Sequence, residues 1–404
     1  MKNDLQAARA PWLPLALAGM CASLVGLGIG RFAYVPLLPL MIDSGWTSGA
    51  GAAQIAAANL VGYLLGGASA HRLALWRGAA PVIRCALIAV LMSLLACSVN
   101  LGLPWLWFWR MTAGAAGGVL MILAAPYLMS RVPLASRGKA IGIVFAGIGI
   151  GVVLSGLAVP AIGANNLRYA WLALAAFVAV AVGYAWPKFA SPSATGAQAA
   201  APGPSQVPPR QRFLPQGALL ALLCAYVLDA IGYLPHTVFW VEYLVHDLGK
   251  PLAIGGAFWA VFGAGAAVGP LISGAAADRF GFRRTLVACF ACKAAAVALP
   301  LASTSMPALF ISSFMVGALT PGMVAVASGR VVEIAGPAAH QRNWAMMTFL
   351  YALVQAAGGY VMAAVHGATH SFTLLFSVAA GALLLAALIA AHGPATRPIV
   401  SPTP

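Results

Sequence analysis

Two arginines lie deep inside apolar stretches of the chain. Arg31 stands in "GIGRFAYVPLLPLM" (residues 28–41), and Arg110 stands in "FWRMTAG" (residues 108–114). An arginine near the centre of a bilayer costs at least about 2.5 kcal/mol on insertion scales, so such residues mark candidate functional sites. The apolar spans around both contain no acid, and two guanidiniums at one depth are suited to bind an anion. We therefore expect Arg31, Arg110 and the nearby Tyr34 to bind an anionic ligand.

A second stretch, "DAIGYLPHTVFW" (residues 229–240), supplies complementary chemistry. Asp229, Tyr233, His236 and Trp240 are spaced i, i+4, i+7 and i+11, which places them within about 40° on one face of a regular helix. A buried acid and a histidine two turns away can pass a proton, because histidine titrates near neutral pH. We expect Asp229 and His236 to carry protons, and Tyr233, His236 and Trp240 to line a binding site. Glu242 lies off this face, and we expect it to form a gate contact.

Each of these assignments has a structural alternative. One arginine could instead bond Asp43 or backbone carbonyls freed by Pro36 and Pro39. Asp229 could be a permanent partner of an arginine across a cavity. Gln355 could line the same cavity, although isolated amides in membrane helices more often bond a neighbouring helix. Lys293 falls within an apolar stretch, and we expect it to extend towards one membrane face, or the boundary of its span to be misplaced, rather than Lys293 to contact a ligand. We expect no metal site and no cofactor.

Composition identifies the environment of these residues. Of the 404 residues, 62% are hydrophobic and only 7% are charged, whereas soluble domains contain about 25% charged residues. The apolar stretches are too long and too continuous for the alternating strands of a membrane β-barrel. We therefore predict an all-α integral membrane protein embedded in a lipid bilayer. No HExxH or GxSxG pattern occurs within a span, so an enzyme is not expected.

At about 20 residues per crossing, the sequence predicts twelve membrane-spanning helices. They cover residues 12–41, 47–71, 80–99, 104–130, 138–162, 167–186, 214–244, 252–277, 283–304, 306–332, 341–366 and 370–392. A stretch rich in Pro, Ala, Ser and Gln separates the sixth span from the seventh and is typical of a flexible linker. The predicted organisation is an N-terminal six-helix bundle (1–186), a linker (187–213) and a C-terminal bundle with a short tail (214–404).

Basic residues predict the orientation. Most of the 22 Lys and Arg fall in the loops on one side of the predicted spans, together with the linker and both termini. Arg168 and Lys250 lie on the other side. The positive-inside rule assigns the basic side to the cytoplasm, and we expect a bacterial inner membrane. The net charge of +15 thus reflects membrane topology rather than a nucleic-acid partner.

The two predicted halves resemble each other. "GIGRFAYVPLLP" in the first span aligns with "AIGYLPHTVFWV" in the seventh, and proline interrupts both. Two weakly similar six-span halves are the layout of secondary transporters that bind substrate between the repeats. The loop "GAAADRFGFRR" (residues 274–284) resembles the loop signature of the major facilitator superfamily. The resemblance implies a cytoplasmic gate motif, formed by Gly274, Asp278, Arg279, Gly281, Arg283 and Arg284.

More specific segments resemble the YbfB/YjiJ-type family of that superfamily. They are "GIGRFAYVPLLPLM" in the first span, "GYLPHTVFWVEYL" in the seventh and "VQAAGGY", around Gln355, in the eleventh. The resemblance covers all twelve spans and implies a transporter. We expect a monomeric secondary active transporter that moves a small organic anion, such as a carboxylate, by proton-coupled alternating access. The alternatives are an exporter of amphipathic drugs or neutral metabolites, and a transporter-like receptor or assembly protein without flux.

Overall fold

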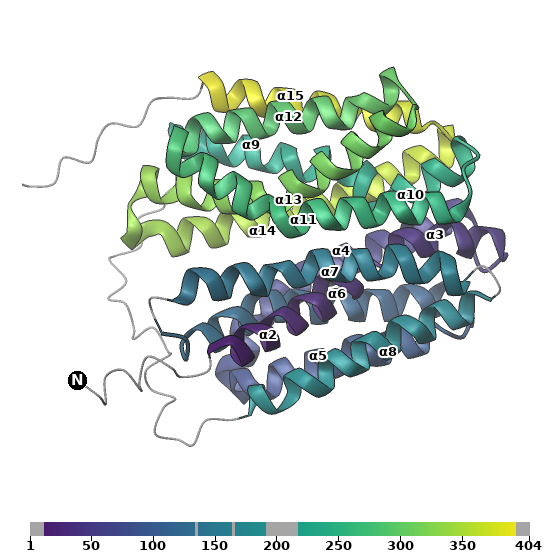
Figure 1. Cartoon of the computed structure of the whole chain (residues 1–404), viewed down its shortest axis with the longest axis horizontal. Helices are drawn as coiled ribbons and strands as arrows, with labels where there is room; N and C mark the ends of the chain where they lie inside the picture. The colour runs from purple at the N-terminus through teal and green to yellow at the C-terminus, as the bar shows by residue number, and fades with distance from the viewer. Residues whose placement is uncertain (1–11, 134–135, 164–165, 191–216, 393–404) are drawn as a thin grey trace, which may run out of the picture.

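In the computed structural model, residues 12–133, 136–163, 166–190 and 217–392 are described. They form helices joined by short connections, and the helices form two bundles (Figure 1). The N-terminal bundle contains α2 (Trp12–Ser23), η1 (Leu24–Ile29), α3 (Tyr34–Asp43), α4 (Gly49–Arg77), α5 (Ala79–Ala96), α6 (Leu103–Met129), α7 (Arg137–Gly163), α8 (Leu167–Ala185) and η3 (Trp186–Phe189). The C-terminal bundle contains α9 (Ala218–Gly232), η5 (Pro235–Phe239), α10 (Trp240–Glu242), η6 (Tyr243–Asp247), α11 (Leu252–Phe280), α12 (Phe282–Ala302), α13 (Met306–Ala335), α14 (Pro337–Thr369) and α15 (Phe372–His392).

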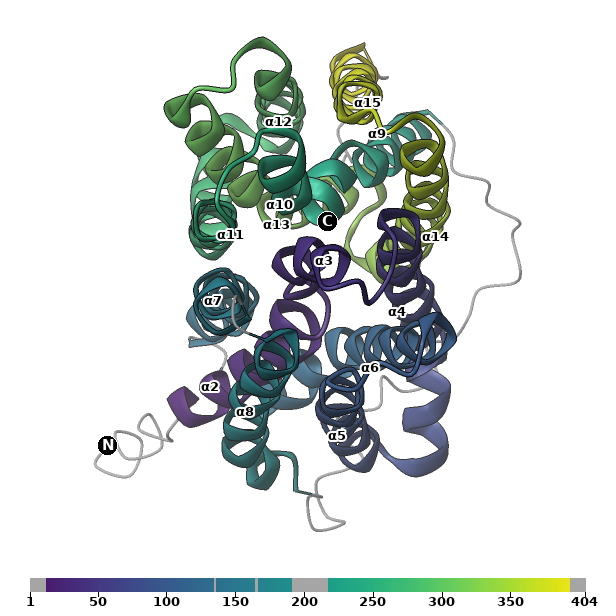
Figure 2. The ribbon, with the colours of Figure 1, turned by 90° about the vertical axis from the view of Figure 1, so that its right-hand side faces the viewer.

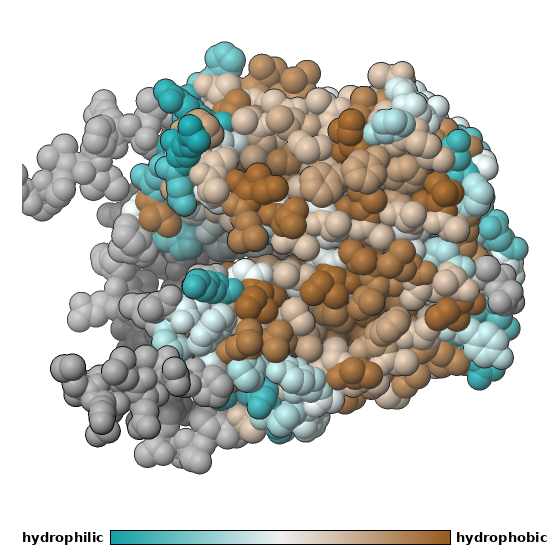
Figure 3. Space-filling model, in the orientation of Figure 1, coloured by the Kyte–Doolittle hydropathy of each residue, from teal (hydrophilic) through white to brown (hydrophobic). Residues whose placement is uncertain are grey.

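These segments make twelve spans in two six-helix bundles, as the sequence predicts. Within the described residues, eleven helical spans are long and apolar enough to cross a membrane. The twelfth is α4, a helix of 29 residues with the polar residues Gln54, Asn59 and His71 along its length. Figure 3 shows an apolar band across the visible face of the molecule between two more polar ends. Residues 191–213 of the predicted linker lie outside the described residues, so the boundaries of the two domains stay predictions.

The first and seventh spans are both interrupted near their middle. The first changes from α2 through the π-helical η1 to a turn, and α3 restarts at Tyr34. In the seventh span, α9 ends at Gly232 and the π-helical η5 begins at Pro235. Proline has no N–H and its ring clashes with the preceding turn, so Pro36 and Pro235 disfavour a continuous helix. The two interruptions leave backbone carbonyls available to side chains at the centre of the molecule.

The two bundles touch at one end and separate towards the other. We call the end that carries Arg77, Arg131 and Arg279 the basic end; it lies on the left in Figure 1. A Cβ added at Gly149 of α7 would lie 2.5 Å from the carbonyl of Gly263 in α11, whereas one at Gly142, nearer the basic end, would lie 4.0 Å from α11. The bundles therefore diverge towards the basic end.

At the opposite end, the contacts between the bundles are close. Figure 2 looks onto this end and shows α3 beside α10, α7 beside α11, and α4 beside α14. A Cβ added at Gly367 of α14 would lie 3.3 Å from the side chain of Ala50 in α4. His246 and Asp43 form an ion pair across the bundles, with 2.9 Å between Nε2 and Oδ1. The structure is therefore closed at this end.

Candidate functional site

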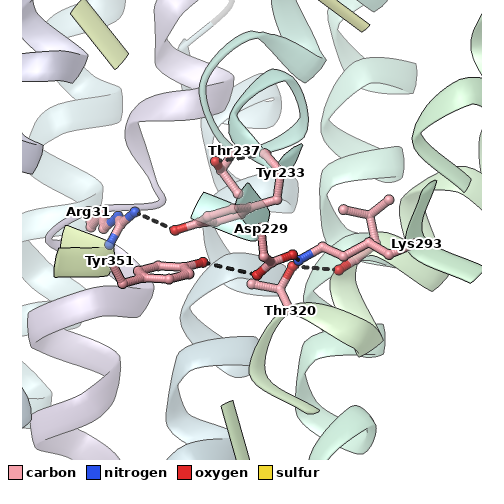
Figure 4. Close-up of polar contacts among 8 residues, drawn as sticks. Arg31, Asp229, Tyr233, Thr237, Lys293, Thr320 and Tyr351 are labelled. Atoms are coloured by element: carbon pink, nitrogen blue, oxygen red, sulfur yellow. Dashed lines mark hydrogen bonds and ion pairs between the residues drawn. The ribbon is translucent and has the colours of Figure 1, made fainter. Parts of the chain in front are cut away.

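Arg31 is the central residue of the candidate site (Figure 4). It lies in the turn between η1 and α3, where the helix is broken, and its side chain is half-buried. Its Nη2 donates a hydrogen bond to the hydroxyl of Tyr233 across the bundles, at 3.0 Å. Its guanidinium carbon lies 4.9 Å from the ring centroid of Phe32 and 5.3 Å from that of Tyr63. Within the described residues Arg31 forms no ion pair, so its charge is available to an anionic ligand.

Asp229 and Lys293 form a buried ion pair inside the C-terminal bundle. Lys293 Nζ lies 2.8 Å from Asp229 Oδ1, and the two side chains are 0% and 2% exposed. The hydroxyl of Tyr351 donates to the other carboxylate oxygen at 3.2 Å. Our expectation for Lys293 was wrong: the side chain points into the bundle rather than to a membrane face. Burial is possible because α9 presents a carboxylate to it, which offsets much of the desolvation cost.

Two tyrosines connect this pair with Arg31. The rings of Tyr233 and Tyr351 stack with centroids 6.1 Å apart, and Lys293 Nζ lies 4.8 Å from the ring centroid of Tyr233. Tyr233 bonds Arg31 and Tyr351 bonds Asp229, as Figure 4 shows. The contacts therefore run from Arg31 of one bundle to a carboxylate and an ammonium of the other. A ligand that binds Arg31 would disturb this network directly.

Arg110 supports Arg31 through the backbone. It is 1% exposed, and its Nη2 donates to the carbonyl oxygen of Arg31 at 3.2 Å. Asn59 donates to the carbonyls of Gly30 and Arg110, at 3.3 and 2.9 Å. The guanidinium of Arg110 lies over the ring of Tyr34 at 5.0 Å. This arrangement matches the structural alternative for one arginine, because Arg110 satisfies a carbonyl at the helix break.

Tyr34 and Gln355 are also buried in this structure. Tyr34 is 2% exposed, and its hydroxyl donates to the carbonyl of Ala52 in the same bundle at 2.9 Å. Gln355 is 2% exposed, and its Nε2 has no hydrogen-bond partner among the described residues. Gln355 lies four residues after Tyr351 on α14, so both fall on the same side of that helix. Of these two residues, Gln355 has a free donor near the network.

His236 and Trp240 lie inside the C-terminal bundle rather than between the bundles. His236 Nε2 is 2.8 Å from Ser312 Oγ, and Trp240 Nε1 donates to Ser313 Oγ at 2.8 Å. The two rings stack with centroids 4.3 Å apart. The expected common face of the seventh span is therefore broken: Tyr233 points to Arg31, whereas His236 and Trp240 point to α13. The interruption between α9 and η5 changes the rotation per residue that the regular spacing assumes.

The gate motif lies at the basic end, at the junction of α11 and α12. Gly281 links the two helices with a φ of 82°, a conformation that favours glycine. Arg283 donates to the carbonyl of Ala391 in α15 at 2.8 Å. Gly274 has no neighbour within 4 Å of an added Cβ, and Asp278, Arg279 and Arg284 are exposed. The bundles are apart at this end, so the role of this motif as a latch stays a prediction.

The sequence reasoning missed two parts of the network. Lys293 was set aside although it lies in the middle of a span, which is itself a signal of a buried partner. Tyr351 was not singled out, although it lies one turn from Gln355. Within the described part of the chain, no group of three or more His, Cys, Asp or Glu residues could hold a metal ion.

Solved structures share this architecture over nearly the whole chain. A D-xylose-proton symporter matches with a TM-score of 0.75 and 15% identity, covering 95% of this chain and 97% of that one. The xylose transporter XylE from E. coli, partially occluded and inward open, matches with a TM-score of 0.71 and 13% identity over 93% and 98% of the two chains. The nucleoside transporter NupG gives 0.71 and 13%, over 94% and 98%. The chain thus shares its fold with these transporters.

The family is also established. Residues 23–391 match the family described as "Uncharacterised MFS-type transporter YbfB". The chain belongs to this YbfB-type family of transporters, as the segments around Arg31, His236 and Gln355 suggest. Among curated proteins, none matches the chain significantly.

Proposed function

We propose that this protein is a secondary active transporter that moves a small organic anion, most simply a carboxylate, by proton-coupled alternating access. The observation that carries the proposal is Arg31: a half-buried guanidinium between two bundles, with no acidic partner among the described residues. Repeat interfaces are where transporters of this architecture bind their substrates. A carboxylate can accept two parallel hydrogen bonds from a guanidinium, which makes arginine well suited to this ligand.

The proposed binding site includes Arg31, Tyr233 and Gln355. The Tyr233 hydroxyl already contacts the guanidinium, and the rings of Tyr63 and Phe32 flank it. Arg110 and Tyr34 contribute indirectly, because Arg110 holds the backbone of Arg31. His236 and Trp240 would shape the C-terminal bundle rather than touch the ligand in this conformation.

Proton coupling is assigned to Asp229, with Lys293 as the group that its protonation releases. A neutral Asp229 would no longer hold the ammonium at 2.8 Å, and Lys293 would then be free to turn towards the bound anion past the ring of Tyr233. His236 lies two turns further along the same span and has an unpaired Nδ1, so it is a second candidate for proton exchange.

The basic end is assigned to the cytoplasm by the positive-inside rule. With that orientation, the protein is in an inward-facing conformation in a bacterial inner membrane, because the bundles diverge at the basic end. We propose a functional monomer, since each six-helix bundle supplies one side of the site.

A neutral or amphipathic solute is the alternative substrate class. It is favoured by aromatic groups at the interface, such as Trp107 of α6, whose Nε1 donates to the hydroxyl of Tyr360 in α14 at 3.1 Å. In that case Arg31 would serve only to hold Tyr233. A receptor without flux would bind the same ligands but would not accumulate them.

Ligand binding to the purified protein tests the proposal. We expect a panel of small carboxylates to contain compounds that raise the melting temperature of the wild type, since a ligand at 100 times its Kd adds about 2.7 kcal/mol of stability. Arg31→Gln should remove this response, whereas Arg168→Gln, an exposed control in the first turn of α8, should retain it. The same compounds should accumulate in proteoliposomes when a proton gradient is imposed. An unchanged response in Arg31→Gln would refute the anion site.

A further inference from the structure

A second acid–base pair is buried at the closed end of the molecule. Glu242 of α10 and His366 of α14 are 4% and 6% exposed, and Glu242 Oε1 lies 3.4 Å from His366 Nε2. The other polar atoms, Glu242 Oε2 and His366 Nδ1, have no hydrogen-bond partner among the described residues. No other contact therefore compensates the charge of this pair.

The pair lies where the C-terminal bundle meets the N-terminal one. A Cβ added at Gly49, the first residue of α4, would lie 3.7 Å from Glu242 Oε1. On the other side, the ring of His366 packs against Phe372 and Phe239, with centroids 4.5 and 5.4 Å apart. Separation of α4 from α10 and α14 would expose both groups to water, and closure removes them from water.

Among the described residues, the other charged and titratable groups near the pair do not take the place of His366 as the partner of Glu242. Those nearby are Tyr34 and Asp43 on α3, Tyr243, His246 and the exposed Asp247 on η6, and His370 directly after α14. Asp43 and His246 pair with each other at 2.9 Å and are partly exposed. Arg110 lies behind the ring of Tyr34. The outer stretch of α11, residues 252–263, contains no titratable side chain.

We propose that Glu242 and His366 form a proton-binding site, and that the outer gate closes over this pair only when it holds one proton. With one proton shared between Oε1 and Nε2, the pair has no net charge. Without it, closure would bury an uncompensated carboxylate, which is strongly unfavourable. The N-terminus of α4 attracts the carboxylate, but a helix dipole at a terminus is a weaker effect than burial of a net charge. The inference rests on the proposed alternating access and on the outward assignment of this end.

This site makes the outer gate sensitive to external pH. In the outward-open state the pair exchanges its proton with the external medium, and a rise in external pH favours that open state. Because one proton is involved, the ratio of open to closed molecules changes by at most about tenfold per pH unit. The proton returns to the same side, so this site regulates closure and is separate from the coupling assigned to Asp229.

Hydrogen exchange measured by mass spectrometry tests the proposal. Wild type and variants are compared at the same pH between pH 6 and 9, without substrate, so that the intrinsic pH dependence of exchange cancels. The peptides of interest cover residues 49–56 and 239–246. Relative to Glu242→Gln, we expect wild-type exchange in these peptides to rise by about tenfold or more from pH 6 to pH 9. Asp43→Asn, which removes the exposed acid–histidine pair, should respond like the wild type.

Three results would overturn the inference. They are a wild type whose exchange equals that of Glu242→Gln at every pH, a Glu242→Gln variant that opens with pH as the wild type does, and an Asp43→Asn variant that loses the response. If Glu242→Gln fails to fold, His366→Asn is used instead. In that variant the carboxylate binds the proton alone, so the rise in hydrogen exchange should occur at lower pH. A rise at the same pH as in the wild type would refute the site. Arg31→Gln should keep the full pH response, so failure of the anion site and failure of this site are distinguishable.

Discussion

Replacement of Lys293 by methionine should show what the buried ion pair contributes to stability. The change removes the ammonium and leaves Asp229 with Tyr351 as its remaining partner. Removal of one member of a buried pair costs about 3–5 kcal/mol, because the other charge is left uncompensated. The Tyr351 hydrogen bond survives, so we expect the lower part of that range, about 3 kcal/mol. That corresponds to a decrease of roughly 10²-fold in the folding equilibrium constant.

A double-mutant cycle separates the ion pair from side-chain packing. Asp229→Asn together with Lys293→Met removes both charges from a site that is at most 2% exposed. Replacement of a buried pair by neutral groups is often neutral or stabilising, so the double variant should recover to within about 1 kcal/mol of the wild type. The measurement is reversible unfolding in bicelles, with the coupling energy taken from the four proteins.

A single Lys293→Met variant within about 0.5 kcal/mol of the wild type would refute this reasoning. It would mean that Asp229 binds a proton at little cost, or that the carboxylate reaches water or another cation. The double variant also separates stability from function. If it is stable but does not accumulate substrate under a proton gradient, the pair serves coupling; if gradient-driven uptake remains, the coupling assignment to Asp229 is wrong.

Two further variants test how the helices position the site. Asn59→Leu removes the side-chain amide that donates to the carbonyls of Gly30 and Arg110. We expect it to cost about 1–3 kcal/mol of stability and to weaken carboxylate binding. Gln54→Leu, at an exposed position of α4, is the control and should change neither. Gly256→Val would collide with the carbonyl of Gly156 across the bundles and should raise hydrogen exchange at the closed end. Gly183→Val is the control, because a Cβ added there meets nothing within 4 Å. Equal exchange in the two variants would contradict the packing argument.

Hydropathy predicts the helices of this protein well because each span must satisfy its own backbone hydrogen bonds in lipid. The predicted span 252–277 corresponds to α11 (Leu252–Phe280), and 306–332 corresponds to α13 (Met306–Ala335). The longest deviation is α4, which continues to Arg77 although its predicted span ends at residue 71. Helix ends that leave the membrane can continue in water, so apolar length underestimates them.

The direction of individual side chains was less predictable, for a physical reason. Pro36 and Pro235 predict that these helices are interrupted, but they do not predict which way the side chains point. The π-helical turns Leu24–Ile29 and Pro235–Phe239 change the angle between successive side chains. The spacing of Asp229, Tyr233 and His236 therefore does not fix their common face. The partner of Asp229 depends on how α9 packs against α12, and this long-range contact has no local pattern in the sequence.

The distribution of buried charge links the site to the conformational cycle. In the C-terminal bundle each buried acid has a basic partner: Asp229 has Lys293, and Glu242 has His366. In the described N-terminal bundle, Arg31 and Arg110 have no carboxylate within ion-pair distance, and Arg110 uses a backbone carbonyl instead. Closure of the basic end around an empty site would bury the unpaired charge of Arg31, which is unfavourable. An anion that neutralises Arg31 removes this penalty, so the same guanidinium that binds the ligand would also make closure of the empty transporter slower than closure of the loaded one.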